Sequence, residues 1–553
     1  MRPFIVVLLL TFFLRIFQIS STPSGLYWDE LDTGYQAYSL LLTGRDYFGN
    51  LFPAHLQSFA DYRSGLYMYL TVPWVKIFGL SPFSVRLTAV FSSILILFIL
   101  YYLARKFLKL PANIAWVVPA VWGLSPWVLV QGRIAAESML MPLFLLTGFA
   151  LLFITRPSTV SRCLSALFFA VTFWTYGTAK VFVPVFLILT AWFFWPKLVH
   201  FFTSKPDWRS LIPPLIIFSL VAFPVVKETL TRNISMRFSE LSVFTDPVTV
   251  SEINFRRLES ALGGGTIRTV GMQPGLMEKL VYNKFTYWSE KVIGNYLKAF
   301  STDFLFTAGD PQLRHHIGLV NTGQFYPVEL VVFLLGLSVL FTSRHNRRTK
   351  LFLIAWLVLS PIAAVLTRDG GNHAPRLLPL LPPMVFIISL GIAELFKHRP
   401  VAYLYLAVYG LCVFLAGFHF FTTYRTKSAA FFNTGFTPAA AYAQSQVNNF
   451  DRVILDGHNE SLLMAYLFTS KFDPAVFQTS FPLPSETLTT GVEGYKFNNL
   501  YILYPGTRDW AKINLDKHNL IITASTQPNS GSLKALTSFL NPDGSTALVA
   551  TVK

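Results

Sequence analysis

The sequence predicts an α-helical polytopic membrane protein with a small α/β domain at its C-terminal end, and composition gives the first reason. Of its 553 residues, 53% are hydrophobic, 16% are aromatic and only 13% are charged. Soluble domains carry about 25% charged residues. A soluble globular protein is therefore excluded for most of the chain.

Eleven apolar segments give the second reason. Each approaches the length of about 20 residues that a helix needs to cross a bilayer. They are residues 3–19, 82–104, 111–130, 138–154, 163–178, 181–198, 210–226, 326–343, 350–366, 376–397 and 401–421. The first has no small-residue cleavage site, so we interpret it as a retained helix rather than a signal peptide.

The charges of the connecting loops give the third reason. With the N-terminus in the cytoplasm, every inner loop is basic: Arg105/Lys106/Lys109, Arg156/Arg162, Lys197/Lys205/Arg209, Arg344/Arg347/Arg348/Lys350 and Lys397/Arg399. The outer loops hold nearly all the loop acids, as the positive-inside rule requires. An odd number of spans places the C-terminal segment outside the cytoplasmic membrane of a bacterium. The net charge of +17 is explained by these loops, so nucleic acid is not an expected partner.

Two outer loops are long, residues 20–81 and residues 227–325. In the first, residues 32–43 and 64–78 are amphipathic but too short or too polar to span a bilayer. They predict interfacial helices that lie on the membrane surface. Together the spans and loops form a membrane domain of residues 1–425.

Residues 426–553 have a soluble composition and predict an extracytoplasmic α/β domain. Strand patterns alternate with helix patterns along this segment. Strands are expected at 452–455, 500–504, 520–523 and 547–552, and helices at 438–447, 460–468 and 533–540. The chain has only two cysteines, Cys163 and Cys412, both in apolar segments, so neither a disulfide framework nor a thiolate metal site is predicted.

Two adjacent carboxylates, Asp29 and Glu30, follow the first apolar segment directly. Charge this close to hydrocarbon is costly and is usually kept for a function. A carboxylate at the membrane surface can remove a proton from a hydroxyl acceptor. The alternative interpretation is a solvated turn.

Basic side chains lie at the ends of the outer loops. The guanidinium of Arg63, after Asp61 and Tyr62, has the geometry to bind a lipid phosphate, although it also suits an interfacial anchor. Arg376, just inside an apolar run and near His373, needs an anion as its partner. Lys180 is an anchor or a phosphate contact.

Two further groups complete the candidate set. Arg133 and Glu137 are four residues apart, which predicts a structural ion pair on a helix. Arg314, His315 and His316 follow one another in the second long loop. Adjacent histidines point in different directions, so this run indicates donors to a substrate sugar or phosphate better than it indicates a metal site.

Several of these residues lie in runs that resemble bacterial family 39 glycosyltransferases, relatives of the protein O-mannosyltransferases and of the aminoarabinose transferase that modifies lipid A. The resemblance spans roughly residues 1–420. It is carried by Trp28-Asp29-Glu30, Gly34-Tyr35-Gln36-Ala37-Tyr38, Ser58-Phe59-Ala60-Asp61-Tyr62-Arg63, Gly79-Leu80-Ser81-Pro82 through Leu87, and Phe304-Leu305-Phe306 through Arg314-His315-His316.

The resemblance implies the GT-C fold and transfer of a sugar from a polyprenyl-phosphate donor to a protein, lipid or glycan acceptor on the outer membrane face. It implies that Asp29 is the base, with Glu30 beside it in the acceptor or sugar site. Arg63 would contact the carrier phosphate, and Arg376 with His373 would help to hold it. No cofactor is required; a divalent metal, if one binds, would lie at Asp29 and Glu30.

Three other functions fit parts of the pattern. A polymerase or ligase that uses the same lipid donors is the nearest enzyme. A transporter or flippase tends to place ionisable residues near the bilayer midplane and to contain inverted repeats, whereas the charges here are at loop ends and no repeat is visible. An envelope scaffold would leave Asp29, Glu30 and Arg376 unexplained.

Overall fold

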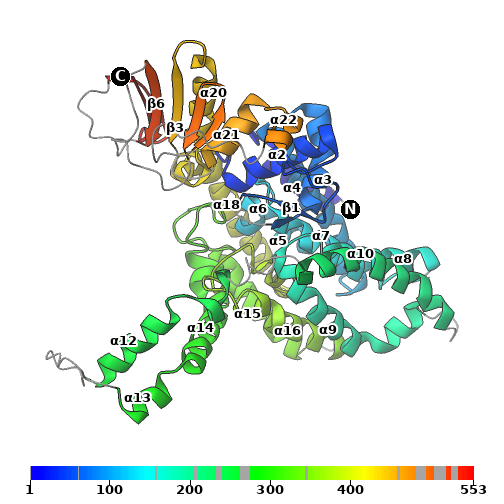
Figure 1. The fold of residues 1–553 in the computed structure, drawn as a ribbon. Helices are drawn as coiled ribbons and strands as arrows, with labels where there is room; N and C mark the ends of the chain where they lie inside the picture. Colours follow the sequence, from blue (N-terminus) through cyan, green and yellow to red (C-terminus); the bar gives the residue numbers. More distant parts are fainter. Residues whose placement is uncertain are drawn as a thin grey trace.

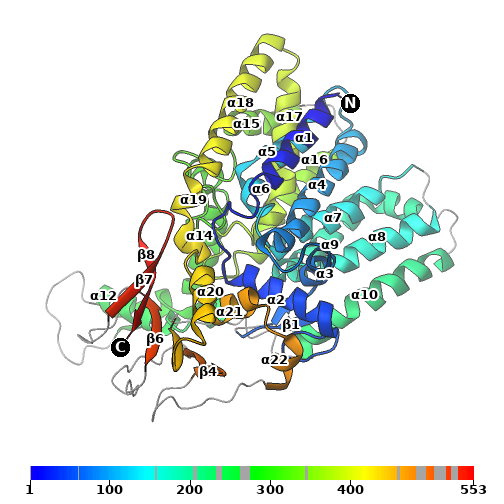
Figure 2. The same ribbon diagram turned by 90° about the horizontal axis from the view of Figure 1, so that it is seen from above.

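The structure is a computed structural model. It describes residues 2–59, 62–155, 158–202, 208–231, 240–261, 274–342, 347–456, 461–480, 494–503, 518–524 and 534–552. Most of this part of the chain is helical, and the helices run side by side in one bundle with a small sheet at one end (Figures 1 and 2).

Apolar helices build the bundle. They are α1 (Arg2–Ile16), α4 (Pro82–Lys106), α5 (Val117–Leu124), α6 (Pro126–Gln131), α7 (Leu140–Leu151), α8 (Thr159–Thr172), α9 (Gly177–Phe202), α10 (Ile212–Thr231), α15 (Pro327–Thr342), α16 (Arg347–Leu359), α17 (Leu381–Leu395) and α18 (Arg399–Phe421). Each of the eleven predicted spans overlaps one or two of them.

Five helices in the described part of the chain are long and apolar enough to cross a membrane: Pro82–Lys106, Gly177–Val199, Ile212–Leu230, Leu378–Leu395 and Arg399–Phe421. Others are apolar but shorter, such as Pro327–Thr342. The chain is therefore a multi-pass membrane protein. Its number of crossings stays a prediction.

Local sequence explains where α4 begins and ends. Ser81 and Ser84 form a capping box, in which each side chain accepts a hydrogen bond from the other residue's backbone N–H, and Pro82 occupies the first helical turn. Arg105 and Lys106 lie in the last turn, where positive charge stabilises the carbonyl end of a helix.

Glycines allow α15 and α17 to pack in close contact. A Cβ at Gly336 would overlap the carbonyl of Ile387, and one at Gly391 would overlap the carbonyl of Val332. Small residues of this kind let membrane helices approach closely, which compensates for the weak hydrophobic driving force in lipid.

The first long loop folds at the end of the bundle opposite the N-terminus (Figure 2). It contains α2 (Trp28–Thr43), the antiparallel pair β1 (His55–Gln57) and β2 (Tyr62–Ser64), and α3 (Leu66–Phe78). Helices are thus present at both predicted interfacial stretches, but α2 begins four residues earlier than predicted. Its first turn therefore includes both Asp29 and Glu30.

The second long loop contains η3 (Val243–Thr245), α12 (Thr249–Ala261), α13 (Leu276–Val281), α14 (Lys284–Ala299) and η4 (Asp303–Thr307). Figure 1 shows α12, α13 and α14 as an arm that projects from the bundle. Residues 308–326 follow η4 without regular structure and return to the site described below.

The segment after α18 contains α19 (Tyr424–Lys427), η7 (Ala429–Phe432), α20 (Phe436–Gln446), α21 (Ser461–Ser470) and α22 (Pro474–Ser480), together with strands β3 (Arg452–Asp456), β4 (Gly494–Phe497), β5 (Leu500–Leu503), β6 (Asn519–Ala524), β7 (Lys534–Leu540) and β8 (Thr546–Val552). The strand order is β4-β5-β3-β6-β8-β7. Strands β5, β3 and β6 are parallel, and the outer pairings are antiparallel.

The helix predicted at 533–540 is wrong, because Lys534–Leu540 is the edge strand β7. The apolar spacing of Leu533, Leu536 and Leu540 is typical of a helix, yet Leu536 and Leu540 are exposed. Pairing with β8 along the whole strand outweighs the local pattern.

The C-terminal segment packs directly on α2. The Tyr35 hydroxyl donates to the carbonyl of Phe472 at 3.1 Å, and Nε2 of Gln478 donates to the hydroxyls of Ser39 and Thr43 at 3.0 and 2.9 Å. A Cβ at Gly34 would overlap the ring of Phe468. This contact fixes one side of the helix that carries the acid pair.

Gly34→Val is expected to weaken this packing. The added side chain would overlap Phe468, and overpacking costs about 1–3 kcal/mol. We expect a lower melting temperature and faster proteolysis of the C-terminal segment. The matched control is Gly294→Val in α14, where a Cβ would meet nothing within 4 Å. Equal effects of the two substitutions would contradict the contact.

Candidate functional site

The two adjacent acids of the first loop point to different surroundings. They occupy the first turn of α2, where negative charge is stabilised by the helix dipole. The Asp29 side chain is 37% exposed, whereas Glu30 is completely buried. Neighbouring positions on a helix are about 100° apart, so one carboxylate faces solvent while the other faces the bundle.

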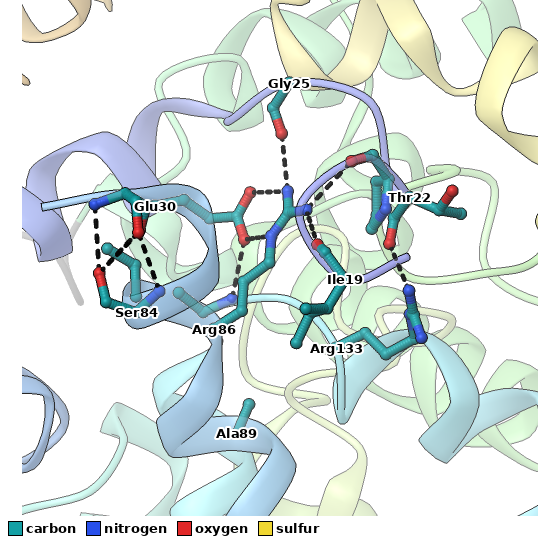
Figure 3. Close-up of polar contacts among 12 residues, drawn as sticks. Ile19, Thr22, Gly25, Glu30, Ser84, Arg86, Ala89 and Arg133 are labelled. Atoms are coloured by element: carbon teal, nitrogen blue, oxygen red, sulfur yellow. Dashed lines mark hydrogen bonds and ion pairs between the residues drawn. The ribbon is translucent and has the colours of Figure 1, made fainter. Parts of the chain in front are cut away.

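Glu30 forms a buried, two-pronged ion pair with Arg86 of α4 (Figure 3). Nε of Arg86 lies 2.8 Å from Oε1 of Glu30, and Nη2 lies 2.9 Å from Oε2. The backbone N–H of Ala135 also donates to Oε1 at 3.0 Å. Both carboxylate oxygens of Glu30 are therefore occupied by protein groups, which leaves Glu30 poorly placed to bind a metal with Asp29.

Arginines hold the backbone between α1 and α2. Arg86 donates to the carbonyls of Ile19 and Gly25 at 2.8 and 2.6 Å. Arg133 donates to the carbonyls of Leu14 and Phe17 at 2.6 and 2.7 Å. It also donates to the carbonyl of Thr22 at 2.8 Å (Figure 3). The predicted ion pair between Arg133 and Glu137 is therefore wrong: Arg133 binds backbone oxygens that are distant in sequence.

Arg63 of β2 joins three carboxylates. Its Nη1 lies 2.9 Å from Oδ2 of Asp32 and 3.7 Å from Oδ1 of Asp29, and its Nη2 lies 2.5 Å from Oε1 of Glu137. Nη1 also donates to the Asp29 carbonyl at 3.1 Å. The Arg63 guanidinium is thus surrounded by three carboxylates. Its contacts connect the start of α2 to β2 and to η1 (Glu137–Met139).

Asp32 is a buried partner that sequence reasoning missed. The Tyr47 hydroxyl donates to its Oδ1 at 2.6 Å, and the Ser58 hydroxyl donates to the same atom at 3.2 Å. Burial raises the pKa of Asp32, and the Arg63 guanidinium partly offsets this. One sequence signal could have identified Asp32. It comes three residues after Asp29, and residues at that spacing lie on the same face of a helix.

Arg314 brings the second long loop to the acid pair. Its guanidinium lies 5.3 Å from the ring centre of Tyr27, the residue that precedes α2. Burial raises the pKa of the Tyr27 hydroxyl, Asp29 and Glu30 raise it further, and Arg314 and Arg63 lower it. Nη2 donates to Gln312 at 2.8 Å, while Nε is buried and has no hydrogen-bond partner among the described residues.

The two adjacent histidines of this loop have different partners. Nε2 of His316 lies 2.7 Å from the carbonyl of Thr322, and its Nδ1 accepts a hydrogen bond from Gly318 at 3.1 Å. His315 instead places Nδ1 at 2.9 Å from Oδ2 of Asp310. His316 therefore shapes the loop, whereas His315 faces a carboxylate.

His373 and Arg376 lie beside this histidine–aspartate pair. The rings of His373 and His315 are 4.8 Å apart at their centres, and the Ala374 N–H donates to Oδ2 of Asp310 at 2.8 Å. Burial, reinforced by the charge of Arg376, lowers the pKa of His373 to about 3, so this histidine is neutral at pH 7. Arg376 forms an ion pair with Asp369.

Lys180 contacts residues other than those around Asp29. Nζ of Lys180 is 2.8 Å from Nε2 of His55, whose Nδ1 is 2.9 Å from Oε2 of Glu228. Tyr62 is half-buried in β2, and Asp61 lies outside the described residues. The structure thus gathers Asp29, Arg63 and Glu137 in one cluster, with Arg314 beside it, and gives Lys180 a separate set of partners.

Comparisons with known proteins support the fold. No family model and no curated protein sequence matches this chain. The crystal structure of ArnT from Cupriavidus metallidurans bound to undecaprenyl phosphate aligns with a TM-score of 0.52 and 12% identity, over 99% of this chain and 97% of that chain. The oligosaccharyltransferase AglB from Archaeoglobus fulgidus, in complex with an inhibitory peptide and a dolichol-phosphate, aligns with a TM-score of 0.47 and 11% identity. That alignment covers 85% of this chain and 63% of that chain.

The ArnT alignment covers nearly the whole of both chains. This chain therefore has the fold of ArnT, in agreement with the resemblance that the sequence shows.

Proposed function

We propose that this protein is an inverting glycosyltransferase that moves a mannose-like hexose or a related sugar from a polyprenyl-phosphate donor to a protein, lipid or glycan acceptor. The reaction would take place at the outer face of the cytoplasmic membrane. Support comes from the fold, since the aligned ArnT structure holds undecaprenyl phosphate, and from the charges gathered at the start of α2.

One observation carries the proposal. Among the four carboxylates that contact Arg63 or Arg86 in the described part of the chain, the exposed fractions are 37% for Asp29, 0% for Glu30 and Asp32, and 9% for Glu137. A general base must come within hydrogen-bond reach of its substrate. Asp29 is the carboxylate that an incoming hydroxyl can meet.

The other members of the cluster then have supporting roles. Arg63 fixes the backbone and the carboxylate of Asp29, while Asp32 and Glu137 compensate its charge. Arg86 and Glu30 hold the start of α2 against the bundle. We therefore propose Glu30 and Arg63 as positioning residues, in place of the direct acceptor and phosphate contacts expected from the sequence.

The donor phosphate needs a cation that is not already neutralised. Negative charge grows on the departing phosphate, and preorganised donors stabilise it. Arg314 fits this role, because its Nε has no hydrogen-bond partner among the described residues and its guanidinium lies over Tyr27. Arg376 and Lys180 would first have to leave Asp369 and His55.

The chemical step follows from this arrangement. Asp29 accepts the proton of the acceptor hydroxyl, whose oxygen attacks the anomeric carbon from the face opposite the phosphate. The bond between that carbon and the phosphate oxygen breaks, and the phosphate leaves with the electron pair. One displacement inverts the anomeric carbon, so a single base suffices.

Arg314→Gln is expected to weaken donor binding about 10- to 150-fold, because a hydrogen bond to a charged group contributes about 1.5–3 kcal/mol. The measurement is the Kd of polyprenyl-phosphate hexose for the purified protein in nanodiscs. Arg425→Gln removes an exposed guanidinium from α19 and serves as the control. Equal affinity for the two variants would remove Arg314 from the phosphate site.

The proposed function itself is tested with radiolabelled polyprenyl-phosphate hexoses, supplied one at a time with envelope material from a strain that lacks this protein. We expect the label of one donor to pass to envelope material only when the protein is present. Inversion is checked by the anomeric coupling constant of the product. Intact donors throughout the series would contradict the proposal.

A further inference from the structure

A second group of side chains, separate from the acid pair, has the composition of a metal site. Asp310, His315 and His373 each offer one ligand atom, and these atoms all lie within 4.8 Å of one another. Asp310 and His315 come from the second long loop, and His373 comes from the turn that precedes α17. The fold therefore brings together metal-ligand side chains from two segments that are about 60 residues apart in the chain.

The surrounding loop orients two of these side chains. Asp310 accepts backbone N–H bonds from Gln312 at Oδ1 and from Ala374 at Oδ2, both at 2.8 Å. The adjacent His316 is turned away by its bonds to Thr322 and Gly318, which leaves His315 facing Asp310. Hydrogen bonds of this kind around a ligand fix its orientation.

His373 supplies the independent observation. Its Nδ1 is buried, and it has no hydrogen-bond partner in the part of the chain that the structure describes. A buried polar atom without a partner costs free energy, and each such atom in a native protein calls for an explanation, of which a bound ion is one. The His373 ring stands beside that of His315, at 4.8 Å between centres.

We infer that Asp310, His315 and His373 bind a divalent transition metal of the zinc class. Two imidazoles and one carboxylate are ligands typical of zinc sites that keep a fourth position open. Bonds of about 2.0–2.2 Å place tetrahedral ligand atoms roughly 3.4 Å apart. The ligand atoms lie within 4.8 Å of one another, so the widest separation must close by at most about 1.4 Å on binding.

The surroundings indicate what the open position would take. Arg314 precedes His315 in the chain, and Arg376 follows His373 closely enough that its charge acts on that ring. Asp369 compensates Arg376 through their ion pair. A metal ion with a guanidinium nearby favours an anionic oxygen ligand, such as a phosphate or a carboxylate. The inference concerns metal binding, and it does not depend on the proposed sugar transfer.

The test is zinc binding by the full-length protein, purified on a tag without histidine and stripped with a chelator. We expect one Zn²⁺ per chain by competition with a chromogenic chelator. Replacement by Co²⁺ should give the intense visible bands of a tetrahedral site. His373→Ala and Asp310→Asn should each lower the affinity at least tenfold, and Zn²⁺ should no longer raise the melting temperature of either variant.

Two variants serve as controls. His398→Ala removes an exposed histidine at the start of α18, and Asp29→Asn changes the proposed base; both should bind zinc like the wild type. Unchanged affinity in His373→Ala would overturn the inference. If that variant does not fold, the cobalt spectrum of the wild type decides, and the absence of tetrahedral bands would overturn it.

Discussion

Asp29→Asn is expected to lower the rate of sugar transfer by ~10²–10⁴-fold, the contribution that general-base catalysis typically makes. Asparagine has nearly the same shape as aspartate but cannot accept the acceptor's proton. The helix start stays intact, because Arg63 also binds the Asp29 carbonyl and pairs with Asp32 and Glu137. The loss should therefore appear in kcat, with donor affinity and melting temperature unchanged.

The measurement is single-turnover transfer from radiolabelled polyprenyl-phosphate hexose by protein in nanodiscs. Asp303→Asn provides the control, since Asp303 is an exposed acid of the second long loop whose carboxylate accepts a hydrogen bond from Thr307. Transfer by Asp29→Asn at the rate of this control would remove Asp29 from the base role. A fall in rate that parallels a fall in melting temperature would show that Asp29 acts through the fold.

The acid pair could be singled out as a candidate from the sequence, but the separation of its two members could not be predicted. Asp29 and Glu30 were found because acids are rare and these two follow an apolar segment. Their roles depend on the rotational position of α2. The amphipathic pattern predicted a helix only from residue 32, whereas the helix begins at Trp28. Without the first turn, nothing in the sequence distinguishes the exposed carboxylate from the buried one.

Partners that are distant in sequence explain most of the remaining differences. Arg86 lies in a run that carried the resemblance, yet its pairing with Glu30 joins positions 56 residues apart. Glu137 was assigned to Arg133 because four residues separate them, whereas the structure gives it to Arg63. Local spacing identifies which side chains can meet on one element, but the topology of the bundle selects among partners on other elements.

The same reasoning applies to the histidines. The sequence shows that His315 and His316 cannot both face one ligand, and the structure confirms that they have different partners. That His373 completes the group could not be foreseen, because a turn near α17 brings it there. The fold class was easier to predict, since hydropathy and loop charge act along the whole chain and the ArnT alignment supports the GT-C fold.

Arg86→Met is expected to produce the largest loss of stability among these substitutions. Removing one partner of a buried ion pair typically costs about 3–5 kcal/mol, because the other charge is left without compensation. In Arg86→Met the group left without a counter-charge is the Glu30 carboxylate, which has no exposed surface. The carbonyls of Ile19, Pro23 and Gly25 lose their donor as well. The free energy of unfolding can be followed by SDS titration in mixed micelles.

The double variant Glu30→Gln/Arg86→Met separates the two causes. It removes the buried charge but leaves the three carbonyls without Arg86, so it should recover part of the loss. Arg425→Met, at an exposed arginine, should change stability by no more than about 0.5 kcal/mol. If Arg86→Met were no more harmful than this control, the ion pair would not hold α2 in place. Asp29 would then depend on Arg63 alone for its position, and Arg63→Lys rather than Arg86→Met would be the substitution that displaces the base.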